Sequence, residues 1–192
     1  MPRAKNHAKK IACLETLWEE DLEEDRLSVL PMLKLLARRG IKFTHLTCNT
    51  KDELAYNLNR LSNFDTKAEY GILYLAFHGS PAHICLDDGS NIHILDDLAP
   101  LMGKNFAKWV IHFGTCSTID TEKLIISAFL NITEASMVIG YTQDVDWIET
   151  AALDLILFDW LQYYKNMKTF WQVFSQKYGE LIAITGMQAF CK

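Results

Sequence analysis

Two short motifs carry side chains suited to nucleophilic catalysis. His78 and Gly79 follow one apolar run, and Cys116 follows another after Gly114-Thr115. A thiol attacks as the thiolate, and a nearby imidazole can take its proton and later protonate a departing amine. Gly79 has no side chain to block a scissile carbonyl, and the backbone N–H groups of Gly79 and Cys116 could hold the oxyanion. The motifs therefore predict a Cys–His dyad for acyl transfer.

Both motifs come at the carboxyl ends of predicted strands. Residues 70–77 and 109–113 are nearly unbroken apolar runs, which is typical of strands covered on both faces of a parallel sheet. Sites in open α/β sheets lie beyond such ends, and neighbouring strands are about 5 Å apart, so the two side chains can approach each other. Singly, His78 is more often a polar residue that ends a strand, and Cys116 a small buried hydrophobe. Their pairing is what favours catalysis.

The rest of the chain alternates between strand and helix signals. Further strands are predicted at 10–17, 41–48 and 135–141, with a short hairpin over 82–95. Helices are predicted from about 28 to 38 with Pro31 in the first turn, after a capping box of Thr50 and Glu53, over 121–130 and over 148–164. Beyond residue 165 we expect a helix around 170–177 and a last strand at 181–185.

This order predicts an α/β fold, a three-layer sandwich around a mainly parallel sheet of five to six strands. We expect one domain over 1–192, with its core at about 9–165 and a C-terminal helical segment at 166–192. The acidic run at 19–25 is either a site for a cation or a basic partner, or a solvated loop before the first helix, and we favour the loop.

Composition excludes several classes of protein. The 192 residues are 49% hydrophobic and 22% charged, unlike a disordered chain, and no apolar stretch is long enough for a transmembrane helix. A net charge of −5 and the lack of a glycine-rich phosphate loop argue against nucleic-acid binding and nucleotide chemistry. The five cysteines have no paired spacing, which favours free thiols in a cytoplasmic protein with no membrane partner.

The motifs resemble those of a known group of peptidases. A strand leading to His78-Gly79 (ILYLAFHG), followed by a strand leading to Cys116 (VIHFGTC), is similar to the paired motifs of the caspase–hemoglobinase fold. Residues 135–161 (ASMVIGYTQDVDWIETAALDLILFDWL) further resemble the CHAT branch, in which a strand ending in glycine, a Trp-x-Val loop and a helix follow the catalytic cysteine. The likeness covers most of 9–164. Gln143 departs from it, because CHAT sequences usually have tryptophan there, and the caspase pattern Gln-Ala-Cys-x-Gly is absent.

The resemblance implies a caspase-like fold, with a flavodoxin-like strand order, and thiol-protease activity. The family's dyad carries over onto His78 as general base and acid and onto Cys116 as nucleophile, with no metal or organic cofactor required. It also implies a peptide or protein substrate, an activating protein partner and a prokaryotic signalling or defence setting. In the superfamily the chain after the fifth strand lines the pocket for the residue before the cut. Here that chain offers Asp144 and Asp146, whose charges suit Lys or Arg, or which are solvated turn residues near a helix start.

Other interpretations stay open. The chain could keep a caspase fold as a catalytically silent interaction or regulatory module. A flavodoxin-like ligand-binding domain would need an anion-binding loop after the first strand, where acidic residues at 19–21 would repel phosphate. His112 lies inside an apolar strand and is expected to be a core residue. In the hairpin, His83 and His93 with Asp87 and Asp88 lack the spacing of a zinc site and favour a turn.

Overall fold

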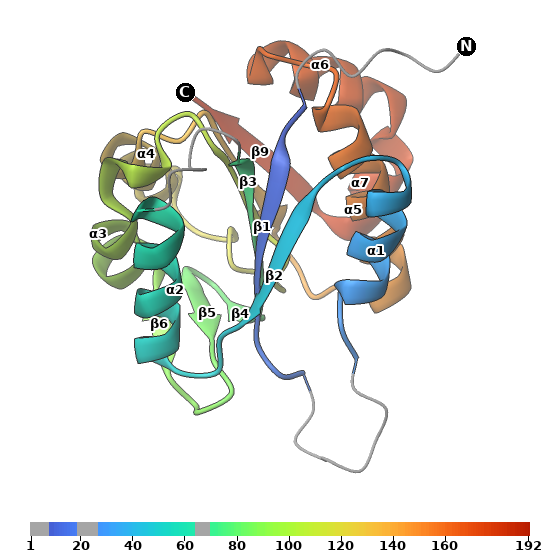
Figure 1. Cartoon of the computed structure of the whole chain (residues 1–192). Coiled ribbons are helices and arrows are strands. Elements are labelled where there is room, and N and C mark those ends of the chain that lie inside the picture. The colour runs from blue at the N-terminus through green and yellow to red at the C-terminus, as the bar shows by residue number, and fades with distance from the viewer. Residues whose placement is uncertain (1–7, 19–26, 64–69) are drawn as a thin grey trace.

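A computed structural model describes residues 8–18, 27–63 and 70–192 (Figure 1). The acidic run at 19–25 lies outside these residues. Among the helices within the described ranges, none combines the length and the apolar content that a membrane crossing requires.

A six-stranded sheet forms the middle layer of the molecule, in the order β2-β1-β3-β7-β8-β9. All neighbouring pairs are parallel except β8 and β9. The predicted α/β class with a mainly parallel sheet is confirmed, and the segments predicted as strands near 10–17, 70–77, 109–113 and 135–141 are its four central parallel strands. The strands are β1 (Lys10–Glu15), β2 (Phe43–Thr47), β3 (Tyr70–Ala76), β7 (Val110–Phe113), β8 (Met137–Tyr141) and β9 (Met187–Cys191).

Helices cover both faces of this sheet (Figure 1). Side chains alternate along each strand, so that Leu73 and Leu75 pack in one core and Ile72 and Tyr74 in the other. Both faces are therefore apolar, which explains the unbroken hydrophobic runs in the sequence. One layer contains α2 (Lys51–Asn63), α3 (Ala99–Met102) and α4 (Lys123–Thr133), and the other contains α1 (Leu30–Arg38), α5 (Trp147–Leu161), α6 (Met167–Lys177) and α7 (Gly179–Thr185).

The residues that predict helix starts from the sequence lie at the starts of helices in the structure. Pro31 lies in the first turn of α1, where its missing N–H costs nothing. At the start of α2, Thr50 Oγ1 accepts the N–H of Glu53 at 3.2 Å, which is half of the predicted capping box. The Glu53 carboxylate completes the cap one residue earlier than predicted, because it accepts the N–H of Asn49 at 2.7 Å.

A second, three-stranded antiparallel sheet follows β3 directly and consists of β4 (His78–Ser80), β5 (His83–Cys85) and β6 (Asn91–His93). The predicted hairpin over 82–95 is the β5–β6 pair. Strand β4 was not predicted, since His-Gly-Ser has little intrinsic strand propensity. It pairs His78 with Cys85, so His78 belongs to a hydrogen-bonded ladder and not to a free loop. A π-helix (Ile94–Leu98), α3 and a 3-10 helix (Gly103–Phe106) then lead back to β7.

The C-terminal part differs from the prediction. Residues 181–185 belong to helix α7, and the last strand is β9, which pairs antiparallel with β8. The prediction of a strand at 181–185 is therefore wrong. A short apolar run fits either structure, and here packing of Leu181 and Ile182 against the second core favours the helix. Gly186 ends the helix at φ +62, a backbone conformation that suits glycine.

Candidate active site

A cavity of about 380 Å³ lies where the central strands end. Its wall includes one residue from the chain after each of four parallel strands, namely Trp18 after β1, His78 after β3, Cys116 after β7 and Val145 after β8. The start of α1, the first turns of α5 and further residues at the ends of β3, β7 and β8 also line it. The structure thus brings His78 and Cys116, the two residues singled out in the sequence, to one cavity.

The His78 side chain is exposed and has a defined contact on one side. Its Nε2 lies 3.2 Å from the carbonyl oxygen of Trp18. Its ring also meets the Trp18 indole edge to face, with 5.0 Å between the ring centroids. Since a carbonyl oxygen only accepts hydrogen bonds, Nε2 is the protonated nitrogen in this contact. In the neutral ring Nδ1 is then the nitrogen with a free lone pair.

Cys116 is half-buried in a loop that is fixed on both sides. The next residue, Ser117, adopts φ +54, and its N–H donates to the Gln143 carbonyl at 3.2 Å. Before and after the cysteine, Thr115 Oγ1 donates to Thr118 Oγ1 at 2.7 Å, and Thr118 Oγ1 donates to the His83 carbonyl at 2.7 Å. A non-glycine residue at positive φ is uncommon and is often found at functional sites. The surrounding bonds hold this conformation in place.

Gly79 brings the chain that carries His78 against the Cys116 loop. A Cβ added at Gly79 would lie 2.3 Å from the Cys116 carbonyl oxygen and 2.4 Å from Thr118 Oγ1. Both distances are shorter than any van der Waals contact, so a side chain at position 79 would push the two motifs apart. The requirement for glycine is therefore steric.

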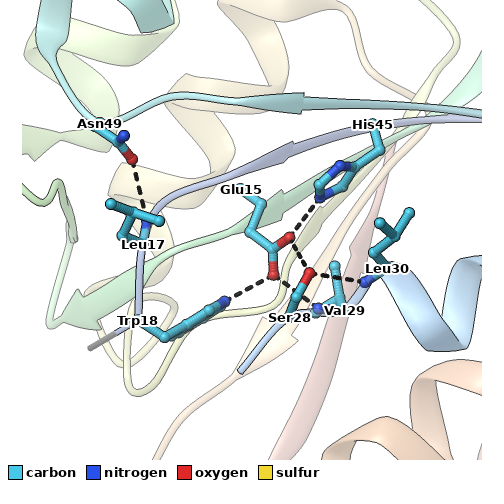
Figure 2. A network of polar contacts seen from close by, with 8 residues as sticks. All are labelled: Glu15, Leu17, Trp18, Ser28, Val29, Leu30, His45 and Asn49. Carbon is cyan, nitrogen blue, oxygen red and sulfur yellow. Dashed lines mark hydrogen bonds and ion pairs between the residues drawn. The ribbon is translucent and has the colours of Figure 1, made fainter. Parts of the chain in front are cut away.

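A buried carboxylate positions Trp18 (Figure 2). Glu15, at the end of β1, accepts from Trp18 Nε1 at 2.8 Å, from the N–H of Val29 at 2.7 Å and from Ser28 Oγ at 2.7 Å. The ring of His45 on β2 also contacts this carboxylate. Burial alone would raise the pKa of the Glu15 carboxyl, but the bonds from His45, Trp18, Val29 and Ser28 outweigh it and hold the pKa below its ordinary value.

A second polar cluster forms the floor of the cavity. Asp154 on α5 is only 1% exposed and lies 2.6 Å from His112 Nε2. It also accepts the hydroxyl of Tyr141 at 2.6 Å and that of Tyr74 at 2.9 Å. The Tyr74 ring stacks on His112, with 5.1 Å between centroids. Burial raises the pKa of both tyrosines well above the ordinary value, with the Asp154 charge adding to the effect, so their hydroxyls stay protonated and donate. His112 is thus a core residue, as predicted.

Comparison with protein families matches residues 8–190 to a family of unknown function (DUF6642). The chain belongs to this family. No curated protein matches it. Among solved structures it is similar to the Drosophila initiator caspase Dronc, with a TM-score of 0.58 and 8% sequence identity over 98% of this chain and 81% of that chain. At that identity the likeness concerns the fold, so this DUF6642 member has a caspase-like fold.

The two aspartates expected in the substrate pocket of this DUF6642 chain lie beside the cavity and are not among its lining residues. Asp146 is the N-cap of α5 and accepts the N–H groups of Ile148 at 2.8 Å and Glu149 at 3.1 Å. Asp144 accepts Ser117 Oγ at 3.1 Å, which ties the loop after β8 to the Cys116 loop. Among the residues that the structure describes, the carboxylate that lines the cavity is that of Asp154.

The five cysteines are free thiols in different environments. Burial raises the pKa of Cys13 well above its ordinary value, with nearby Glu15 adding to the effect. Burial also raises the pKa of Cys48, to about 11, and that of Cys191. These three thiols are therefore poor nucleophiles at neutral pH. Cys85 is half-buried and is not among the residues lining the cavity, which leaves Cys116 as the cysteine of the cavity wall.

The predicted hairpin does contain a pair of histidines, since the rings of His83 and His93 meet at 4.9 Å between centroids. Their contacts are local: His83 Nδ1 lies 2.8 Å from the Pro81 carbonyl, and His93 Nδ1 accepts the N–H of Asp96 at 3.1 Å. Across residues 8–18, 27–63 and 70–192, no three His, Cys, Asp or Glu side chains are grouped so that they could hold a metal ion.

Several residues of the site were not found from the sequence. Glu15 lies inside the predicted strand at 10–17, and Trp18 comes between that strand and the acidic run at 19–25, so the sequence pattern assigns neither residue a role. Asp154 looked like a polar position on a mostly apolar helix. One signal was available for each carboxylate: an acidic residue within a run of buried positions must find hydrogen-bond donors, because an unpaired buried charge is very unfavourable.

Proposed function

We propose that this DUF6642 member is a cysteine peptidase in which Cys116 is the nucleophile and His78 is the general base and acid. One observation supports this most directly. In a caspase-like fold, both side chains line one cavity at the ends of neighbouring parallel strands, and the His78 ring is oriented by the Trp18 carbonyl. Orientation of the base by a third group is a general feature of activated nucleophiles.

In the proposed reaction, Nδ1 of His78 takes the thiol proton of Cys116, and the thiolate attacks the scissile carbonyl carbon. As the tetrahedral intermediate collapses, Nδ1 returns the proton to the departing amine and the C–N bond breaks. Water, deprotonated by the same nitrogen, then attacks the thioester carbon, which releases the carboxylic acid and restores the thiol. Protons balance over the cycle, and no metal or organic cofactor takes part in the proposed steps.

The oxyanion would be held by the backbone N–H groups of Gly79 and Cys116. The close packing of Gly79 against the Cys116 loop supports this assignment, because it keeps the two peptide groups in fixed relation. Such donors are effective when they are already positioned before the reaction.

Within the caspase-like fold we propose the CHAT branch. Strand β8, a loop with Val145 on the cavity wall and the long helix α5 follow Cys116 in the order that the resemblance implies. Gln143, which replaces the usual tryptophan, donates its side-chain amide to the Ile184 carbonyl at 2.5 Å and so joins this loop to α7. A peptide or protein substrate and an activating protein partner follow from the same proposal.

The test is peptide cleavage by the full chain with three variants. A diverse peptide mixture is incubated with the wild-type protein, Cys116→Ser, His78→Ala and Cys85→Ser, and new termini are identified by mass spectrometry. We expect cleavage by the wild type and by Cys85→Ser, which removes a thiol outside the cavity, and at least about a thousandfold loss in the other two. Equal cleavage by wild type and Cys116→Ser would refute the proposal. No cleavage by any of them, also after addition of lysate from the source cells, would favour the catalytically silent module.

A further inference from the structure

We infer that the cavity beside Cys116 receives a large, uncharged apolar side chain of the substrate, the one that precedes the bond to be cut. This inference rests on the proposed peptidase function and names its substrate class. It is carried by the lining of the cavity and by the hydrogen bonds of the carboxylates that the structure describes near it.

The lining of the cavity is largely aromatic and aliphatic. Trp18 and Trp147 meet edge to face at 5.2 Å between centroids, and Val29, Met32 and Val145 complete the apolar wall. A cavity of about 380 Å³ has the size of an ordinary small-ligand site. Burial of a large apolar side chain against such a wall is favourable because it removes apolar surface from water.

Glu15 is not available to a cationic substrate group. Its oxygen Oε1 accepts from Trp18 Nε1 and Val29 N–H, and Oε2 accepts from Ser28 Oγ and contacts His45 Nε2. A carboxylate has about four acceptor positions, and all of them are used here. The residue is 4% exposed, so this carboxylate supports the wall and does not face the cavity with a free oxygen.

Asp154 is occupied in a similar way. Oδ1 is shared by His112 Nε2 and the Tyr141 hydroxyl, and Oδ2 accepts the Tyr74 hydroxyl. The other ring nitrogen of His112, Nδ1, faces the Ile139 carbonyl at 3.3 Å. Since a carbonyl oxygen only accepts hydrogen bonds, Nδ1 is the donor in this contact. Three contacts from the described residues thus hold the Asp154 carboxylate at the floor of the cavity.

The loop carboxylates lie outside the cavity wall. Asp146 is bound to the first N–H groups of α5, and Asp144 to Ser117 Oγ. Within residues 8–18, 27–63 and 70–192, the carboxylates near the cavity thus already have hydrogen-bond partners, so a Lys or Arg side chain there would compete with those partners and lose hydration of its charge, which is unfavourable. An Asp or Glu side chain would also lose hydration of its charge against the apolar wall.

The inference is tested with peptidyl acyloxymethyl ketones that differ only in the residue next to the reactive group: Phe, Leu, Lys or Asp. The rate at which each labels Cys116 is measured by intact-mass spectrometry on the full chain. We expect the Phe and Leu compounds to react at least about tenfold faster than the Lys and Asp compounds.

Two neighbouring alanines of α5 provide a matched pair of variants. Ala151 lines the cavity and Ala152 is exposed. Ala151→Leu should reduce labelling by the Phe compound about tenfold or more, because it fills the space that the ring needs, while Ala152→Leu should leave the rate unchanged. Fastest labelling by the Lys compound would overturn the inference in favour of Asp144 and Asp146, and equal rates for all four would also overturn it.

A binding measurement separates failure of this inference from failure of the proposed function. Saturation-transfer NMR on Cys116→Ala compares acetylated peptide amides with the same four residues and needs no reactive thiol. If Cys116 is inert to every ketone but the Phe peptide binds selectively and loses binding in Ala151→Leu, the peptidase proposal fails and the apolar selectivity of the cavity stands. If labelling proceeds without any preference, the peptidase proposal stands and the inference fails. If labelling and selective binding are both absent, both fail.

Discussion

The Nε2 atom of His78 lies 3.2 Å from the carbonyl oxygen of Trp18, and the two rings meet edge to face. Trp18 is held in turn by its 2.8 Å hydrogen bond to the Glu15 carboxylate. The orientation of the proposed base thus depends on a buried charge at the end of the neighbouring strand. Trp18 acts here as a positioning residue, since it fixes which ring nitrogen of His78 can accept a proton.

The first prediction concerns the reactivity of the thiols. At mildly acidic pH, iodoacetamide should modify Cys116 first, because a nearby imidazole supports the thiolate while burial raises the pKa of Cys13, Cys48 and Cys191. His78→Ala should slow this reaction by about tenfold or more while the protein stays folded. Peptide mapping by mass spectrometry over a pH series measures the rate for each cysteine.

The control for this prediction is His83→Ala, which removes an imidazole of the neighbouring strand whose side chain contacts the Pro81 carbonyl. It should leave the rate at Cys116 unchanged. If His78→Ala and the wild type are labelled at Cys116 at equal rates, the histidine does not activate the thiol, and the dyad is refuted.

The central sheet could be read from the sequence because its signals are local. The run at 70–77 is apolar at almost every position, and its short length between turn signals favours a strand covered on both faces over a buried helix. His78 and Cys116 could be paired for the same reason, since parallel strands place their carboxyl ends along one edge of the sheet.

The hydrogen-bond partners of the two buried carboxylates at the site could not be found in this way. Glu15 depends on donors from His45 and Ser28, and Asp154 on Tyr74 and His112, all of which are distant in the sequence. Their contacts arise from tertiary packing and leave no periodic signal. The helix at 181–185 was missed for a similar reason, because packing and not intrinsic propensity decided its structure.

The second prediction concerns the close approach at Gly79. Gly79→Ala places a Cβ 2.3 Å from the Cys116 carbonyl oxygen, so one of the two motifs must move. We expect a loss of about 1–3 kcal/mol in the free energy of unfolding and slower labelling of Cys116. Gly179→Ala is the control, since its Cβ would meet no atom within 4 Å, and it should be neutral or stabilising by about 0.4–1 kcal/mol. Urea unfolding measures both, and similar curves for the two variants would contradict the prediction.

The third prediction concerns acid stability. The pKa of Glu15 is lower in the folded protein than its ordinary value of 4.5, so its carboxylate stabilises the fold fully above that value, and the contribution is lost as pH falls through the folded pKa. Glu15→Gln should cost about 1.5–3 kcal/mol at neutral pH, because an amide nitrogen then faces the donors. The gap between wild type and variant should narrow as the solution is acidified.

Urea unfolding at neutral and at acidic pH measures this gap. Glu122→Gln is the control, because Glu122 is exposed and makes no side-chain capping bond, and its gap to the wild type should stay near zero. A gap for Glu15→Gln that stays constant between the two conditions would show that the carboxylate charge is not what stabilises the network.

The fourth prediction concerns the floor of the cavity. Asp154 and His112 are both buried and lie 2.6 Å apart, so a change at one of them leaves the other without its buried partner. Asp154→Asn should cost about 3–5 kcal/mol in the free energy of unfolding, whereas Tyr74→Phe removes one neutral donor and should cost about 0.5–1.5 kcal/mol. In a double-mutant cycle, Asp154→Asn with His112→Gln should cost less than the sum of the single changes by about 0.5–3 kcal/mol. Additive costs would mean that no ion pair exists there. The apolar preference of the cavity depends on this network, because an Asp154 carboxylate without these partners would attract a basic side chain instead.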